Sequence, residues 1–271
     1  MNEITIKAGR SEAHYWRDMW RYRELFGFLA WRDILVRYKQ TFIGVAWAVL
    51  RPFLTMVIFT VIFGTVAKLS SGSLPYPILV AAAMLPWQFF ANALGESSQS
   101  LVTNSNLISK VYFPRMILPA SAIVVSFVDF LISFIILIGL MFYYRYMPDW
   151  RICLLPAFIL LAIVSALGPG LIITTLNVKY RDFRYIIPFI LQFGLYISPV
   201  GFSSSVIPEK WRLLYSLNPM VGVIDGFRWA IGDTSALNLP GLTCSVIVGF
   251  GLLGIGIGYF RKMERTFADI I

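Results

Sequence analysis

The chain alternates between long apolar stretches and short polar ones. Between Phe42 and Phe260, six stretches of roughly twenty apolar residues carry almost no charge. Lipid offers a backbone no hydrogen-bond partners, so such stretches form helices that satisfy their own amides and carbonyls. We therefore predict an all-α integral membrane protein whose single transmembrane domain comprises residues 1–271. The six predicted spans are residues 45–67, 76–94, 117–144, 152–176, 185–202 and 239–260.

Composition narrows the classes of function. The 271 residues are 58% hydrophobic and 14% charged, whereas soluble domains carry about 25% charged residues. Little chain remains for a second, soluble domain. In a membrane protein the net charge of +9 fits an anionic leaflet or an anionic lipid-linked substrate better than nucleic acid. The single histidine, His14, and the two cysteines, Cys153 and Cys244, indicate neither a metal site nor a disulfide framework.

The distribution of basic residues predicts the orientation. With the N-terminus inside, 17 of the 23 Lys and Arg residues fall in the predicted cytoplasmic parts and six in the outer parts. Positive residues favour the cytoplasmic side. Both termini are therefore predicted to be cytoplasmic. Residues 1–40 are charged and aromatic and show no cleavable signal.

Residues 15–42 form the first informative segment outside the spans. They predict an amphipathic helix in the inner headgroup region, because their apolar residues recur at helical spacing. One face holds Phe28, Trp31, Leu35, Tyr38 and Phe42, and the other holds Asp33, Arg37 and Gln40. A charged tail without this structure is the alternative.

Two further segments lie between spans. Residues 95–116 are polar, are predicted to face the cytoplasm, and are long enough for a short helix on which another protein docks. Residues 203–238 predict two short helices that dip into the outer leaflet. Pro208 and Pro219 stand where helices begin, Asn218 is a predicted N-cap and Gly232 a predicted end. An outer loop lying flat on the membrane is the alternative.

Asp129 is the one ionisable residue predicted to lie deep in a span. A carboxylate there costs about 2.5–3.5 kcal/mol on insertion scales, so it should face protein or water. Ser126 and Ser133 share its helical face and could line an aqueous path with it. Protonation, or pairing with a neighbouring helix for structural reasons, explains the residue equally well.

Aromatic side chains make up 16% of the residues. Tyr185, Phe189, Phe193 and Tyr196 form a stripe on the fifth span, and Trp87 and Phe90 share a face of the second. Such rings stack on sugars, although lipid contact or helix packing explains any single ring. The dipeptide Gly-Lys is absent, so the chain has no phosphate-binding loop of the G-x-x-x-x-G-K-[S/T] type.

Several stretches together resemble the membrane subunits of type-2 ABC exporters that move polysaccharides. Residues 32–52 (RDILVRYKQTFIGVAWAVLRP) resemble the N-terminal signature of that family. The similarity continues, in the family's order, through residues 179–184 (KYRDFR), 198–200 (SPV), 217–220 (LNPM) and 227–229 (FRW).

The resemblance implies a fold and partners that the residue pattern alone does not. Members work as homodimers with two cytoplasmic ABC ATPase subunits, in the cytoplasmic (inner) membrane. The chain would be a transport subunit and not an enzyme, with ATP and Mg²⁺ bound only by the partner. The implied substrate is a lipid-linked glycan of the O-antigen, capsule or teichoic acid type.

The resemblance also assigns roles to residues. ATPase coupling falls to Arg32, Arg37, Ser100, Asn104 and Lys110. Contact with a lipid phosphate falls to Arg37, Lys39 and Arg51, for which positive-inside topology is the plainer explanation. The channel lining comprises Trp87, Phe90, Asp129, Tyr185, Phe189, Phe193 and Tyr196. The outer gate comprises Trp211, Tyr215, Asn218, Phe227 and Arg228.

Two other functions are the alternatives to polysaccharide export. An ABC permease for a lipid or a drug-like small molecule usually lacks the signature at residues 32–44. A membrane glycosyl- or phosphotransferase needs paired acidic residues at the membrane surface. Asp225 and Asp233 are close in sequence, but they are predicted to lie on the outer side without a basic and aromatic frame.

Overall fold

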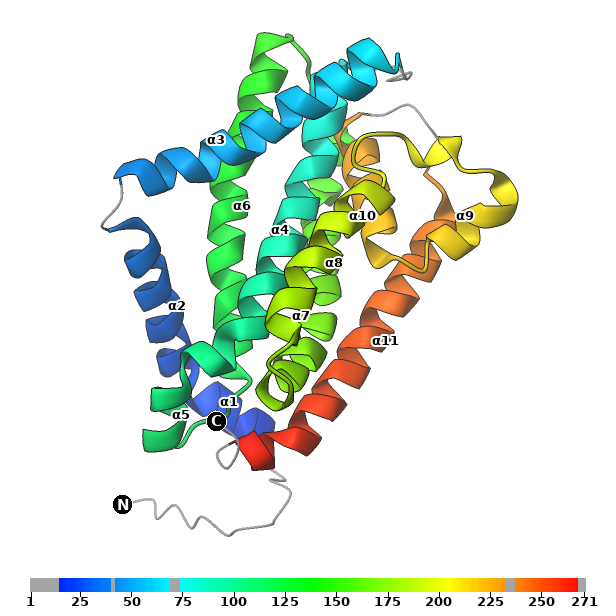
Figure 1. Ribbon diagram of the computed structural model, residues 1–271. Coiled ribbons are helices and arrows are strands. Elements are labelled where there is room, and N and C mark those ends of the chain that lie inside the picture. The colour runs from blue at the N-terminus through cyan, green and yellow to red at the C-terminus, as the bar shows by residue number, and fades with distance from the viewer. Residues whose placement is uncertain (1–14, 40–41, 69–73, 233–236, 268–271) are drawn as a thin grey trace.

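The computed structural model describes residues 15–39, 42–68, 74–232 and 237–267, and over these ranges it contains helices and no strand (Figure 1). The first helices are α1 (Tyr15–Arg21), α2 (Arg23–Tyr38) and α3 (Phe42–Phe59), which continues as the π-helix η1 (Thr60–Val66). Next come α4 (Tyr76–Thr103), α5 (Ser105–Lys110), α6 (Ile117–Tyr143), η2 (Trp150–Leu154) and α7 (Leu155–Lys179). The last are α8 (Phe183–Ile197), η3 (Ser204–Val206), α9 (Glu209–Tyr215), α10 (Pro219–Ile231), α11 (Leu239–Met263) and η4 (Glu264–Thr266).

Five helical segments are long and apolar enough to cross a membrane: Val49–Val66, Tyr76–Thr103, Ile117–Tyr143, Trp150–Lys179 and Leu239–Thr266. They confirm the all-α class and five of the predicted apolar helices. The predicted span at 185–202 is wrong at its C-terminal end, because α8 stops at Ile197 and turns follow through Phe202. Fifteen residues reach only about 22 Å, short of a hydrocarbon core of about 30 Å. A sixth crossing by α8 stays a prediction.

Helix α4 continues well past its predicted boundary at residue 94. Its polar extension accommodates serines because their hydroxyls donate to carbonyls of the same helix, Ser98 to Gly95 and Ser100 to Ser97. Two prolines mark the beginning of α4. Pro75 is its N-cap, and Pro77 stands in the first turn, where a missing N–H is tolerated.

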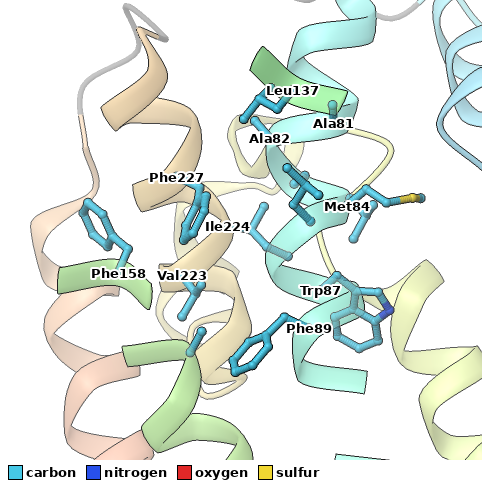
Figure 2. Close-up of a cluster of buried hydrophobic side chains, with 14 of the residues drawn as sticks. Ala81, Ala82, Met84, Trp87, Phe89, Leu137, Phe158, Val223, Ile224 and Phe227 are labelled. Atoms are coloured by element: carbon cyan, nitrogen blue, oxygen red, sulfur yellow. The ribbon is translucent and has the colours of Figure 1, made fainter. Parts of the chain in front are cut away.

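Helix α4 is also the centre of the bundle. In the apolar 18-residue stretch of α4, 72% is buried inside the molecule. The corresponding value for the stretch formed by α3 and η1 is 17%. Side chains of α4, α6, α7 and α10 form one apolar cluster around it, including Ala82, Phe130, Phe158 and Phe227. Figure 2 shows Ile224 of α10 pointing towards α4, while the ring of Trp87 projects from the side of α4 that faces away from α10. One side of α4 therefore builds the core and leaves another side for a cavity.

Glycines let α7 and α11 approach closely. A Cβ atom at Gly168 would lie 2.6 Å from the backbone nitrogen of Leu253, and one at Gly256 would lie 2.4 Å from the carbonyl oxygen of Gly168. Close backbone approach through small residues is how membrane helices gain packing contacts, since lipid supplies no hydrophobic drive between them.

The N-terminal segment departs from the predicted single helix over residues 15–42. It forms two helices, α1 and α2, with a break at Tyr22. Leu29 of α2 packs in one cluster with Met116 and Ile117 at the start of α6. The same cluster contains Tyr15 of α1 and Phe267 near the end of the chain. The two ends of the described chain therefore lie together at one end of the bundle, as Figure 1 shows.

The predicted aromatic face of this segment is only partly as expected. Phe28, Trp31 and Leu35 are exposed along α2, which suits contact with lipid or another chain. Tyr38 instead turns to the same partner as Arg37, so it does not continue that face. Gln40 lies outside the described residues. The position of α2 at a membrane surface stays a prediction.

Candidate functional site

A cavity of about 870 Å³ lies within the single chain. Residues of α2, α3, α4, α6 and α8 line it. Concave sites of this size with a few polar groups are the usual places for ligands.

Ionic contacts at the cavity join three helices. The Arg37 guanidinium of α2 donates to Asp129 of α6 at 2.6 Å and to Glu96 of α4 at 2.5 Å. The Tyr38 hydroxyl donates to the second oxygen of Asp129. Burial, and then the hydrogen bond to Asp129, raises the pKa of Tyr38. Asp129 is thus held by a neighbouring helix while it lines the cavity.

The wider predicted path around Asp129 is only partly present. Ser133 lines the cavity with Asp129. Ser126 is buried and donates to the Ala122 carbonyl in its own helix at 3.1 Å. Glu96 and Tyr38 were not predicted as site residues. Their signal was weak, because a carboxylate after an apolar run and a tyrosine on an aromatic face have many ordinary explanations.

The residues predicted to contact a lipid phosphate separate into two groups. Arg37 and Arg51 line the same cavity, from α2 and α3 respectively. Lys39 is exposed just after α2 and does not line it. The structure therefore brings two of the three predicted cationic side chains, Arg37 and Arg51, to the same cavity.

The predicted coupling residues lie near one end of the bundle, except Arg37. Arg32 of α2 donates to the side-chain oxygen of Asn104 at 3.0 Å. The amide of Asn104 in turn donates to the Ser100 carbonyl at 2.9 Å. Ser100 is buried, and Lys110 is exposed at the end of α5. The amphipathic α2 and the α4–α5 junction are thus directly connected.

The predicted aromatic lining divides between the cavity and the outer surface of the chain. Trp87 and Tyr196 line the cavity. Phe90 packs beside Trp87, with ring centroids 5.5 Å apart, but does not line it. Tyr185, Phe189 and Phe193 are 77%, 60% and 52% exposed on α8. Their stripe faces out of this chain, where lipid or another chain can cover it.

The segment after α8, predicted to lie on the outer side, contains the two short helices predicted for it, α9 and α10. Pro208 precedes α9, and Asn218 caps α10 by accepting from the Met220 amide at 3.1 Å. Gly232 ends α10 with φ at 132°, a conformation that favours glycine. The segment is tied to the end of α8. Tyr215 donates to the Ile197 carbonyl at 2.6 Å and Asn218 to the Ser198 hydroxyl at 3.0 Å.

Of the predicted gate residues, Trp211 is exposed whereas Phe227 and Arg228 are buried. Phe227 packs edge-on against Phe130 of the core. Arg228 donates to the carbonyls of Leu79, Val200 and Phe202 at 3.2, 2.9 and 2.7 Å. A buried guanidinium needs such acceptors. Arg228 therefore anchors α10 to α4 and to the turn after α8.

Comparisons with known proteins agree with this architecture. The family model of the ABC-2 type transporter matches residues 24–231. The chain is 28% identical to the O-antigen export system permease protein RfbA of Klebsiella pneumoniae, over 89% of this chain and 92% of the relative. It is 26% identical to the protein of that name from Myxococcus xanthus, over 94% of this chain and 98% of the relative. It is 22% identical to the polysialic acid transport protein KpsM of Escherichia coli, over 87% and 92%. The matched region contains α2 from Glu24 onward, the cavity and helices α9 and α10. The chain is a multi-pass membrane protein of the ABC-2 type transporter family.

Proposed function

We propose that this chain is the membrane subunit of an ATP-driven exporter for a lipid-linked polysaccharide of the O-antigen or capsule type. It works in the cytoplasmic membrane with both termini in the cytoplasm. Two copies and two separate ATPase subunits make up the exporter. ATP and Mg²⁺ bind only to the ATPase.

The observation that carries this proposal is similarity over nearly whole chains to relatives named as O-antigen export permeases. Both the polysialic acid relative and the O-antigen relatives carry names that refer to polysaccharides. These names favour a polysaccharide over the lipid or drug-like substrate of other permeases.

A separate motor is supported by the sequence, which lacks the Gly-Lys dipeptide of the common phosphate-binding loop. The hydrogen bond from Arg32 to Asn104 supports a route by which movement of the ATPase reaches α2. An ATPase docked on α5 would move the α4–α5 junction and, through Arg32, helix α2. Exposed Lys110 at the end of α5 is available to such a partner.

The path of the substrate follows from the cavity and the exposed stripe of α8. The lipid phosphate would approach Arg37 and Arg51 in the cavity. The glycan would pass Trp87 and Tyr196 and leave beneath α9 and α10. In the paired exporter, the α8 stripe of Tyr185, Phe189 and Phe193 would line the space between two copies. Relative movement of the copies, driven by the ATPase, would open this path.

Deletion and complementation test the proposal. Cells without the gene should lose surface polysaccharide and accumulate lipid-linked glycan inside, and the intact chain should restore export. The purified chain alone should hydrolyse no ATP, whereas the complex with its ATPase should. Normal surface polysaccharide in the deletion strain, or hydrolysis by the isolated chain, would contradict the proposal.

A further inference from the structure

Helix α4 carries a row of polar side chains that begins in its predicted apolar span and continues into its polar extension. Gln88, Asn92, Glu96 and Gln99 follow one another at intervals of four, four and three residues, so they share one helical face. All four line the cavity, and Gln192 of α8 lines it as well. This face is distinct from the apolar side of α4 that builds the core around Ala82.

The amide groups in this row are not used to hold the protein together. Within the described ranges, the side chains of Gln88, Asn92, Gln99 and Gln192 form no hydrogen bond with protein. Other amides of the chain do have such bonds. Asn177, for example, is buried and donates to the Ser98 carbonyl at 2.9 Å. The four cavity amides therefore differ from the structural ones.

Placing such groups in a membrane protein has an energetic consequence. An amide in an apolar environment without a partner is unfavourable by several kcal/mol in the least polar reference solvents. Polar residues inside membrane segments accordingly face cavities or functional paths. Asn92 and Gln192 are exposed and Gln88 and Gln99 are half-buried in the single chain, so water or a hydroxylated ligand in the cavity can satisfy these four amides.

The amide groups that line the cavity favour an uncharged part of a ligand. Arg37 is bonded to Glu96 and Asp129, and with Arg51 the cavity lining holds two positive and two negative side chains, which offset one another. The amides each offer both a donor and an acceptor, which matches a hydroxyl group that also does both. The rings of Trp87 and Tyr196 lie on the same cavity and offer flat apolar faces. Hydroxyl groups together with apolar faces are the surface of a sugar.

We propose that Gln88, Asn92, Gln99 and Gln192, the amide wall, bind the hydroxyl groups of the glycan as it passes through the cavity. This inference rests on the proposed function and adds the residues that replace the glycan's water. Gln88 and Asn92 are about 6 Å apart along the helix axis. A chain moving along α4 therefore exchanges one amide for the next without losing all its hydrogen bonds at once.

Photo-crosslinking in intact cells tests contact directly. Asn92→p-benzoylphenylalanine is introduced into the chain together with its ATPase in cells that make the glycan. The matched control is Ile138→p-benzoylphenylalanine, because Ile138 is 54% exposed on α6 and does not line the cavity. After irradiation, periodate and hydrazide staining detects glycan on the purified chain. We expect a stained adduct at position 92 and none at position 138.

Two results would overturn the amide wall. One is equal staining at both positions, and the other is an adduct at position 92 that contains only a second copy of the chain. The latter would show that the amides face another subunit. Gln192→p-benzoylphenylalanine provides a second site on another helix, with the same expectation, so that loss of export from one substitution still leaves a reading.

Side-chain replacement tests the energetic role. Asn92→Leu combined with Gln88→Met keeps side-chain size but removes the amides, and we expect the initial rate of export to fall about tenfold because sugar hydroxyls lose their partners. Asn92→Gln should keep most export, and Thr243→Val, which alters an exposed polar group of α11, should change nothing. Thr243→Val should also leave the basal ATP hydrolysis of the complex unchanged. Unchanged export in the double variant would refute the role.

Different results would contradict the proposed function and the amide wall. If deletion of the gene leaves surface glycan intact, the proposed function is wrong. If the unaltered chain exports glycan but no adduct forms at positions 92 and 192, the amide wall alone is wrong.

Discussion

Arg37 of α2 and Asp129 of α6 form an ion pair of 2.6 Å, although 92 residues separate them in the sequence. The start of α2 packs at the start of α6, and this pair joins the end of α2 to the middle of α6. Asp129 comes twelve residues after Ile117, the first residue of α6, which corresponds to about 18 Å along the helix axis. Helix α2 therefore runs lengthwise beside α6, and the ion pair sets how deeply it reaches.

Removing the Asp129 charge should loosen α2. Asp129→Asn leaves the Arg37 guanidinium with a weaker acceptor in a partly buried place, and we expect a loss of about 1–3 kcal/mol in unfolding free energy. Thermal unfolding of the purified chain measures this. The control is Glu209→Gln, which breaks the exposed pair with Arg212 and should cost less than about 0.5 kcal/mol. Similar losses in both variants would show that the Arg37 pair has no special weight.

Arg228 should be more important for stability than a surface arginine. Arg228→Met preserves length but removes every donor to the carbonyls of Leu79, Val200 and Phe202. We expect a loss of about 3 kcal/mol and faster hydrogen exchange in α10. Arg212→Met is the matched change, because Arg212 donates to two carbonyls near the surface. An equal loss of unfolding free energy in Arg212→Met would show that the buried position of Arg228 adds no stability.

The close packing of α7 and α11 predicts a sharp difference between two glycines. Gly256→Val places atoms against the Gly168 carbonyl, whereas a Cβ atom at Gly254 meets nothing within 4 Å in the chain. Overpacking typically costs about 1–3 kcal/mol. The melting temperature in detergent should fall for Gly256→Val and stay near that of the unaltered chain for Gly254→Val. Equal melting temperatures would argue that the helices separate easily.

The outer helices give a prediction about leakage. Combining Trp211→Ala with Tyr215→Ala should let small solutes pass through the resting exporter in liposomes, because α9 loses its aromatic bulk and its bond to the Ile197 carbonyl. Tyr215→Phe removes the bond alone and should leak less. Dye efflux from loaded vesicles measures both. Vesicles as tight as those with the unaltered chain would mean that α9 closes nothing.

Tyr38 predicts a loss of stability at high pH. Its pKa is raised by burial and by Asp129, so the folded chain holds the hydroxyl proton more tightly than the unfolded chain does. Its contribution is complete below the ordinary tyrosine pKa of about 10 and declines as pH rises above that value through the raised pKa. The melting temperature between pH 8 and pH 11 should fall less steeply in Tyr38→Phe. Parallel curves for the two proteins would contradict this linkage.

Local physical chemistry made much of the fold predictable from sequence. Long apolar runs require helices in lipid, and this gave the all-α class. Pro208, Pro219, Asn218 and Gly232 mark the ends of α9 and α10 correctly, because capping depends on neighbouring backbone groups. The resemblance of residues 32–52 to a family signature agrees with the family match.

Contacts between distant helices were decided only by the tertiary structure. The sequence contains Arg228 and Asp129 as isolated charges, and nothing local shows that one meets three carbonyls and the other meets Arg37. Periodicity placed Tyr38 on an apolar face, yet its hydroxyl reaches Asp129 because α2 packs beside α6. The amide row on α4 is visible as spacing, but only packing against α2, α3, α6 and α8 turns it into the wall of a cavity. Helical period follows from bonds within a few residues, whereas these partners depend on how whole helices pack.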